Sequence, residues 1–235
     1  MTSGLHEHHI SVTRTARYYT LGRSHAGVRE LWIVCHGFGQ LAARFLRHFE
    51  AIESPTRLIV APEALSRYYL DGGSGVHGPQ ARVGATWMTR EDRLSEIGDY
   101  VGYLDALAAQ QLDELERDRV RVTVLGFSQG AATVCRWIAG GTVRADRLIL
   151  WAGAIPPEFD LVVHRELLGA LELVLVLGTA DELVTGDQLA RQEERLQRAG
   201  VAYRVVRFDG GHKLDDGALR GIAQLGSGER GAMRS

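Results

Sequence analysis

The sequence predicts an α/β protein with a mostly parallel, twisted sheet that carries helices on both faces. The continuous apolar run at residues 31–35 and the nearly pure aliphatic run at 171–177 are typical of strands covered on both sides. Segments with apolar residues at helical spacing separate such runs, and residues 91–117 form the longest of them. Because strands that alternate with helices usually pair in parallel, these two observations favour one doubly covered sheet.

The first 90 residues are predicted to contain three strand regions and one helix before the pattern breaks. The strand regions lie at 9–21, where one or two edge strands are expected, at 31–35 and at 57–62, and the helix lies at 41–49. Residues 63–90 are glycine-rich and have no periodicity. A loop of this length is usually functional, so we expect it to form a wall of the site.

The remainder of the chain continues the alternation of helix and strand. After the helix at 91–117 we expect strands at 120–127, 147–151, 171–177 and 202–208, with helices after Ser128, at 161–170, at 186–199 and in a last segment that ends at Leu225. In open sheets of this kind the ligand lies beyond the carboxyl ends of the strands. Polar residues that directly follow strands are therefore the candidates for chemistry.

Length and composition narrow the function classes. A chain of 235 residues that is 45% hydrophobic suits a single domain, 1–235, with loose ends at 1–8 and 226–235. The net charge of −2 and the absence of long like-charge runs predict no nucleic-acid partner. No apolar segment has the length of a membrane span or of a leader, so we expect no stable membrane insertion and a cytoplasmic location. Oligomeric state is not predicted.

Neither the cysteines nor the histidine-rich start of the chain predicts a cofactor. Cys35 and Cys135 fall in apolar segments and are expected to be buried and unpaired. His6, His8 and His9 form a metal-like pattern, which we interpret as a frayed terminus that binds metal only adventitiously. We expect no metal site.

One motif concentrates the chemistry, the stretch Gly126-Phe127-Ser128-Gln129-Gly130 between a predicted strand and a predicted helix. A serine in so tight a bend adopts a strained backbone, and glycines two residues before and after avoid collisions of their Cβ atoms. The G-x-S-x-G pattern is that of the nucleophile elbow of α/β-hydrolases. Taken alone it also fits a serine in an ordinary strand-to-helix loop.

Other strand ends supply partners for Ser128. Asp181 and His212 follow later strands, in the order Ser, Asp, His known for α/β-hydrolases. His212 would take the proton of Ser128, and Asp181 would hold the imidazole tautomer. The stretch 36–39, His-Gly-Phe-Gly, would bring the N–H of Phe38 to a developing oxyanion, with the N–H of Gln129 as the second donor.

Alternatives to this assignment remain open. Asp209 lies three residues before His212 and could be the acid, although a loop-capping role is favoured. Glu158, after the preceding strand, is a weaker candidate. His36 is interpreted as a residue that braces the oxyanion loop rather than as a base.

Four motifs together resemble the phospholipase/carboxylesterase family of α/β-hydrolases, which includes acyl-protein thioesterases. They are the stretches 36–39 and 126–130, Gly178-Thr179-Ala180-Asp181 and Gly210-Gly211-His212. The resemblance covers residues 30–225. It implies an α/β-hydrolase fold with no large lid domain and a serine esterase without a cofactor. The chain departs from the family pattern at Gln40, Ala131 and Thr185, where many members have Asp, Gly and Pro, and this leaves the substrate open.

Substrate contacts are predicted from apolar residues near the motifs. Candidates for an apolar acyl pocket are Phe38, Tyr69, Trp87, Met88, Trp151, Ile155 and Leu183. Trp87 and Leu183 are favoured because the corresponding segments border the site in the resembling family. The leading hypothesis is hydrolysis of a small-molecule carboxylic ester through an acyl-enzyme on Ser128, with thioesters and lysophospholipids as further candidate substrates. A lactone or peptide hydrolase, or a receptor of this fold with little turnover, is the alternative.

Overall fold

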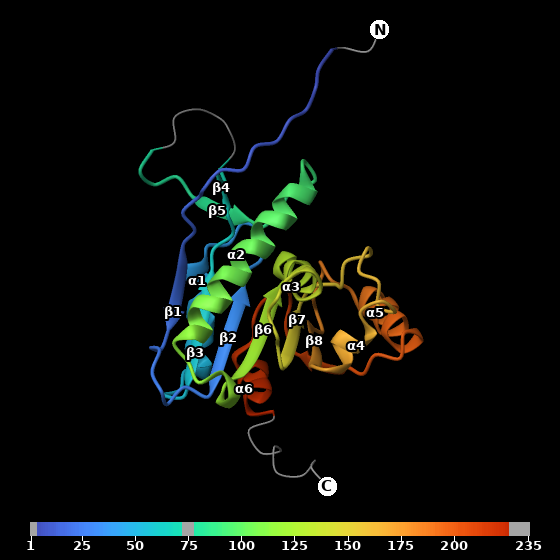
Figure 1. Ribbon diagram of the computed structural model, residues 1–235. Coiled ribbons are helices and arrows are strands. Elements are labelled where there is room, and N and C mark those ends of the chain that lie inside the picture. The colour runs from blue at the N-terminus through green and yellow to red at the C-terminus, as the bar shows by residue number, and fades with distance from the viewer. Residues whose placement is uncertain (1–3, 72–77, 226–235) are drawn as a thin grey trace.

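A seven-stranded sheet forms the centre of the computed structural model, which describes residues 4–71 and 78–225 (Figure 1). The strand order is β1-β3-β2-β6-β7-β8-β9, and every neighbouring pair is parallel except β1 with β3. The bounds are β1 Tyr18–Leu21, β2 Glu30–Cys35, β3 Arg57–Pro62, β6 Arg121–Phe127, β7 Arg147–Trp151, β8 Glu172–Gly178 and β9 Arg204–Phe208. The predicted, mostly parallel sheet is confirmed.

Helices cover both faces of this sheet. One face packs against α1 (Ala42–Leu46), the 3₁₀ helix η1 (Arg47–Ile52) and α6 (Asp216–Gln224). The other face packs against α2 (Arg93–Asp113), α3 (Gln129–Gly140), α4 (Arg165–Gly169) and α5 (Gly186–Arg198). A further short 3₁₀ helix, η2, spans Arg117–Arg119. Because strand side chains alternate between faces, Ile33 contributes to one core while Trp32 and Val34 contribute to the other.

The register of the parallel strands brings their carboxyl ends to one edge. The paired positions near that edge are Cys35 with Gly126, Phe127 with Trp151, and Gly178 with Phe208. Residues that follow β2, β6, β8 and β9 therefore emerge side by side. This edge contains the predicted motifs.

Residues 63–90 differ from the prediction of a structureless loop. They contain an antiparallel hairpin of β4 (Ser66–Tyr69) and β5 (Val83–Thr86), which forms a separate two-stranded sheet. The sequence does not reveal it because β4 contains a charged residue, Arg67, and β5 contains Gly84, neither of which favours a strand. Residues 72–77 of the predicted loop lie outside the described residues.

Three smaller predictions also need correction. Residues 10–14 are exposed and form no strand, so the edge strand is β1 alone. The helix expected at 41–49 is divided into α1 and η1, and the helix expected at 91–117 ends at Asp113. Leu94, placed in the core stripe of that helix, is 75% exposed.

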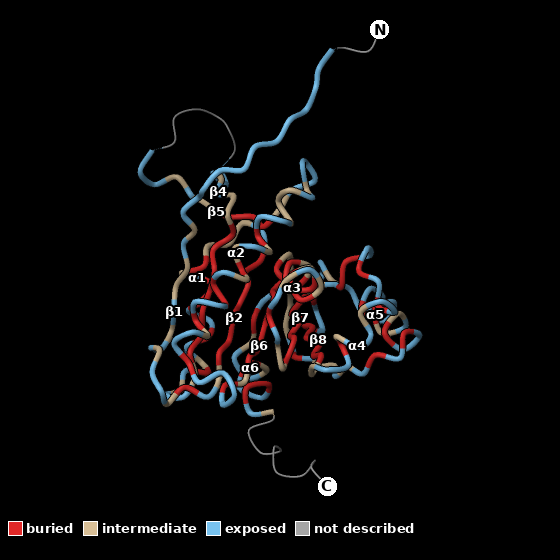
Figure 2. Tube along the Cα trace, in the orientation of Figure 1, coloured by how far each residue is buried: buried red, intermediate tan, exposed pale blue. Residues whose placement is uncertain are grey.

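Burial follows the sheet, as Figure 2 shows, with buried positions on the central strands and exposed ones along the N-terminal segment. Of the ends predicted to be loose, residues 4–8 are exposed, whereas 1–3 and 226–235 lie outside the described residues. The described residues contain no large lid domain. Among the helices they form, none combines the length and apolar character needed to cross a bilayer.

Candidate active site

Ser128 lies in a strained turn between β6 and α3. Its φ and ψ are 54° and −115°, a conformation that a residue with a side chain rarely adopts. The Ser128 N–H donates to the carbonyl of Trp151 at 2.9 Å, which ties the turn to β7. A Cβ on Gly126 would lie 2.2 Å from the Gly130 oxygen, and a Cβ on Gly130 would lie 2.2 Å from the Cys35 oxygen. Only glycine fits at these two positions.

His212 connects the serine to a carboxylate. Its Nε2 lies 3.0 Å from Ser128 Oγ, and its Nδ1 lies 2.9 Å from Asp181 Oδ2. Since a carboxylate only accepts hydrogen bonds, Nδ1 donates to Asp181 and Nε2 is left to accept from the serine hydroxyl. The ring of Phe127 packs against the imidazole with centroids 5.0 Å apart. The result is a hydrogen-bonded chain with the geometry used in nucleophilic catalysis.

The loops that carry the acid and the base are joined to each other. The Ala180 N–H donates to the carbonyl of Gly210 at 2.9 Å, and a Cβ on Gly178 would lie 2.3 Å from that oxygen. The Asp181 side chain is fully buried, and its Oδ1 accepts the N–H groups of Leu183 and Val184, each at 2.9 Å. These donors stabilise the carboxylate in its buried position.

Neither of the two alternative carboxylates, Glu158 and Asp209, is hydrogen-bonded to His212 among the described residues. Glu158 accepts hydrogen bonds from Arg136 and Arg93. Partial burial acts to raise its pKa, but these bonds dominate and hold the pKa down to about 2. Asp209 is exposed, and the Nδ1 of His212 is already bonded to Asp181. Of the three carboxylates, Asp181 is the one that the structure brings to His212.

The loop of residues 36–40 approaches the serine from β2. A Cβ on Gly37 would lie 3.2 Å from Ser128 Cβ and 3.0 Å from the Phe127 ring, so the backbone passes close to the nucleophile. Gly39 has a φ of 73°, and its N–H donates to the carbonyl of Ala85 at 2.8 Å. Within residues 4–71 and 78–225, neither the N–H of Phe38 nor that of Gln129 has a hydrogen-bond partner. Two donors thus remain available beside Ser128.

His36 braces this loop from inside the protein. It is completely buried, its Nδ1 lies 2.8 Å from the Gly37 carbonyl, and its Nε2 accepts the Ala64 N–H at 3.1 Å. Burial lowers the pKa of His36, which keeps the imidazole neutral with its proton on Nδ1. The position fits the structural role expected from the sequence.

The two favoured substrate contacts have different surroundings. Leu183 is 68% exposed, two residues after Asp181. Trp87 is 2% exposed, and its indole N–H donates to the carbonyl of His36 at 2.8 Å. This position favours support of the oxyanion loop over direct contact with a substrate. The sequence did not indicate a role for the side chain of Gln129, whose amide bonds to Thr86 and Trp87. These contacts depend on the position of β5, a strand that the sequence did not predict.

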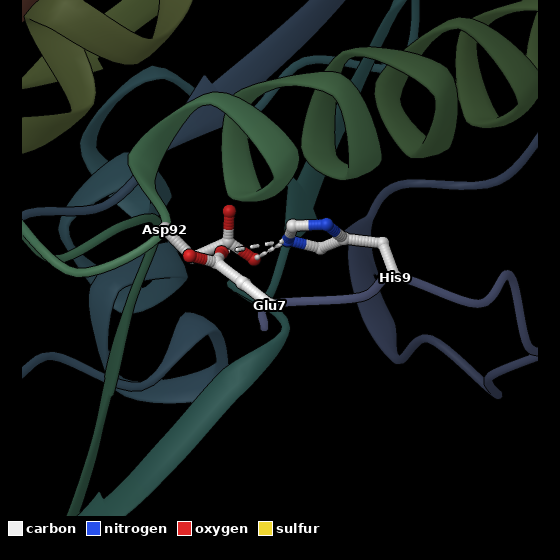
Figure 3. Close-up of side chains that lie close together, drawn as sticks. All are labelled: Glu7, His9 and Asp92. Atoms are coloured by element: carbon white, nitrogen blue, oxygen red, sulfur yellow. Dashed lines mark ion pairs between the residues drawn. The ribbon is translucent and has the colours of Figure 1, made fainter. Parts of the chain in front are cut away.

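The histidine-rich start of the chain has an acidic neighbour that the sequence did not suggest. His9 Nε2 lies 3.3 Å from a Glu7 oxygen and 3.2 Å from an oxygen of Asp92, which precedes α2 (Figure 3). The ligand atoms of these three residues lie within 4.8 Å of one another, and all three residues are exposed. Ion pairing accounts for the contacts.

The cysteines offer no competing nucleophile. Cys35 and Cys135 are both free and buried. Burial raises the pKa of Cys35, and it raises the pKa of Cys135 to about 12 despite the nearby Arg136 and Arg195. A thiol with so high a pKa stays protonated and unreactive.

Fold and site together define an α/β-hydrolase with a serine, a histidine and an aspartate at the carboxyl edge of its sheet. Residues 23–225 match the family model described as phospholipase/carboxylesterase, and the chain belongs to this family. It is therefore a hydrolase of the esterase type. No curated protein matches the sequence.

Solved structures show the same fold at low sequence identity. Acyl-protein thioesterase 2 of Zea mays superimposes with a TM-score of 0.66 at 17% identity, covering 89% of this chain and 96% of that chain. A carboxylesterase of Mesorhizobium loti gives 0.60 at 22% identity, covering 89% and 93%. Esterase PE8 gives 0.60 at 20% identity, covering 89% and 97%.

Proposed function

We propose that the protein is a serine hydrolase that cleaves carboxylic esters or thioesters through an acyl-enzyme on Ser128. The observation that supports this most directly is the chain of contacts from Ser128 Oγ to His212 at 3.0 Å and from His212 to Asp181 at 2.9 Å. A serine hydroxyl becomes an effective nucleophile when an adjacent base takes its proton.

The reaction follows from this geometry. His212 Nε2 accepts the proton of Ser128 as Oγ attacks the carbonyl carbon, and the same nitrogen then returns a proton to the leaving alcohol or thiol. Water attacks the resulting acyl-enzyme with His212 again as the base. Asp181 keeps the proton on Nδ1 and stabilises the imidazolium. The N–H groups of Phe38 and Gln129 stabilise the oxyanion in both steps.

We propose an apolar acyl group as the feature that the site recognises. Phe38, whose backbone N–H is one of the proposed oxyanion donors, is 59% exposed, and Leu183, whose N–H donates to Asp181, is 68% exposed. Large exposed apolar side chains on residues that belong to the proposed site supply surface for an acyl chain. Small carboxylic esters, thioesters and lysophospholipids can all carry an apolar acyl group.

Replacement of the nucleophile tests the proposed function. Ser128→Ala should lower kcat for p-nitrophenyl esters by about 10⁶-fold, because no other described group can form the acyl-enzyme. The matched control is Ser54→Ala, which removes a hydroxyl in the turn before β3, at the opposite edge of the sheet. Turnover retained by Ser128→Ala in a clean preparation would contradict the proposal.

A fluorophosphonate separates an enzyme from a receptor of the same fold. We expect stoichiometric labelling of Ser128 together with turnover of at least one member of a series of acyl esters, thioesters and lysophospholipids. Labelling without any turnover would instead identify a binding protein with a reactive serine.

A further inference from the structure

The segment from Gly84 to Met88 contacts both sides of the proposed oxyanion hole. On one side it pairs with the loop after β2, where Gly39 N–H donates to Ala85 O at 2.8 Å and Ala85 N–H donates to Gln40 O at 3.2 Å. Strand β5 therefore has a second partner besides β4. The loop that carries the Phe38 donor is held along this strand.

Trp87 extends the contact to the start of the same loop. Its indole N–H donates to the carbonyl of His36, two residues before Phe38, at 2.8 Å. The Trp87 and His36 rings lie with centroids 5.2 Å apart, and both residues are buried. A buried hydrogen bond to a backbone carbonyl limits how far the Phe38 N–H can move.

The second donor is held from the same segment through a side chain. Gln129 Nε2 donates to Met88 O and to Thr86 Oγ1, each at 2.9 Å, and Gln129 Oε1 accepts the backbone N–H of Trp87 at 3.2 Å. The whole amide is thereby used, and among the described residues no group accepts the backbone N–H of Gln129, beside Ser128. Gln129 is the first residue of α3 and Ser128 is its N-cap, so a fixed Gln129 side chain fixes the start of the helix.

We propose that Trp87 and the side chain of Gln129 are positioning residues that set the distance between the two oxyanion donors. Trp87 is the shared element, because its indole holds the Phe38 loop and its backbone N–H holds Gln129. The two donors lie on separate segments, after β2 and after β6, and no described hydrogen bond joins Phe38 to Gln129 directly. This inference rests on the proposed function, since it concerns the same reaction.

The test compares substitutions that keep both backbone donors. Trp87→Phe keeps an aromatic ring and removes the bond to His36, whereas Gln129→Ala removes the side-chain amide. We expect each to lower kcat by roughly 10- to 100-fold with little change in KM, because a misplaced donor affects the transition state more than the bound substrate. The double variant should lose less than the product of the two single losses, since both act on one distance.

Trp137→Phe is the matched control. Trp137 is also completely buried, and its indole N–H donates to Asp105 at 2.7 Å, between α3 and α2. The substitution also removes the indole hydrogen bond of a buried tryptophan, here to a carboxylate and away from the oxyanion loop. Because hydrogen bonds to charged groups are stronger, we expect it to lower the Tm at least as much as Trp87→Phe does while kcat stays near the wild-type value.

A second measurement does not depend on turnover. Amide hydrogen exchange of residues 36–40 should become faster in Trp87→Phe and Gln129→Ala and stay unchanged in Trp137→Phe. Wild-type exchange and kcat in the first two variants would overturn the inference while leaving the proposed function intact. If the wild type has no esterase activity, the proposed function fails. The exchange experiment alone then decides whether Trp87 and the Gln129 side chain hold the loop of residues 36–40.

Discussion

Two sets of groups lie beside Ser128, one made of side chains and the other of backbone N–H donors. On one side His212 and Asp181 act through their side chains, linked at 2.9 Å. On the other side the proposed donors are the backbone N–H groups of Phe38 and Gln129, whose places depend on contacts made by other residues. A single substitution of His212 or Asp181 removes one of these side chains completely. No side-chain substitution removes the backbone N–H donors, and it can only change their positions. We therefore expect smaller and graded losses of kcat on the donor side.

The largest effect is expected on the acid–base side. Asp181→Asn should lower kcat by about 10⁴-fold, because an amide next to Nδ1 favours the wrong imidazole tautomer. Asp209→Asn is the control, since Asp209 is exposed and three residues from His212, and it should keep near wild-type kcat. Steady-state hydrolysis of a p-nitrophenyl ester measures both. The reverse ranking would move the acid to Asp209.

A smaller loss is expected when β5 is pushed away from the oxyanion loop. A Cβ at Gly84 would lie 2.5 Å from the Gly39 carbonyl oxygen, so Gly84→Ala must shift the loop. We expect a fall in kcat of roughly 10-fold or more with nearly unchanged KM. Gly102→Ala on α2 is the control, because its Cβ meets nothing within 4 Å and alanine favours a helix. Equal kcat values for the two variants would contradict the role of β5.

The smallest effect concerns pH and stability. Because burial lowers the pKa of His36 in the folded protein, the unfolded chain binds its proton more readily. The contribution of neutral, buried His36 to the free energy of unfolding is fully present above pH 6.5, which is the pKa of the residue in the unfolded chain. It decreases as the pH falls from there towards the pKa in the folded protein. The slope from this one residue is at most about 1.4 kcal/mol per pH unit. Denaturant unfolding between pH 7.5 and 5 should show a flatter dependence for His36→Gln than for the wild type.

The acid–base side was largely predictable from the sequence because its residues are tied to short local patterns. Ser128 lies in a glycine-flanked turn, and Asp181 and His212 lie in the short loops that follow β8 and β9. Parallel strands bring their carboxyl ends together, so strand-end residues far apart in sequence meet. The sequence alone does not separate Asp181 from Asp209, since both lie near strand ends.

The oxyanion side was predictable only in part. The glycines at 37 and 39 indicated a loop that approaches an oxyanion, but the sequence did not indicate what holds that loop. Its support comes from β5, which has only four residues and includes Gly84. Trp87 was favoured as a substrate contact because a large apolar residue near a site fits a pocket as well as a core. Its burial and its bond to His36 are tertiary facts.

The sequence by itself determined the alternation of helix and strand, the strained serine turn and the places of Asp181 and His212 after strands, because each depends on residues that are neighbours in the chain. Tertiary structure decided which buried groups contact the segments that carry the two proposed backbone donors. Those contacts are hydrogen bonds between segments more than 40 residues apart, from Trp87 to His36 and from Gln129 to residues 86–88. Such bonds are set by how the β4–β5 hairpin packs against the sheet edge, and no local periodicity records that packing.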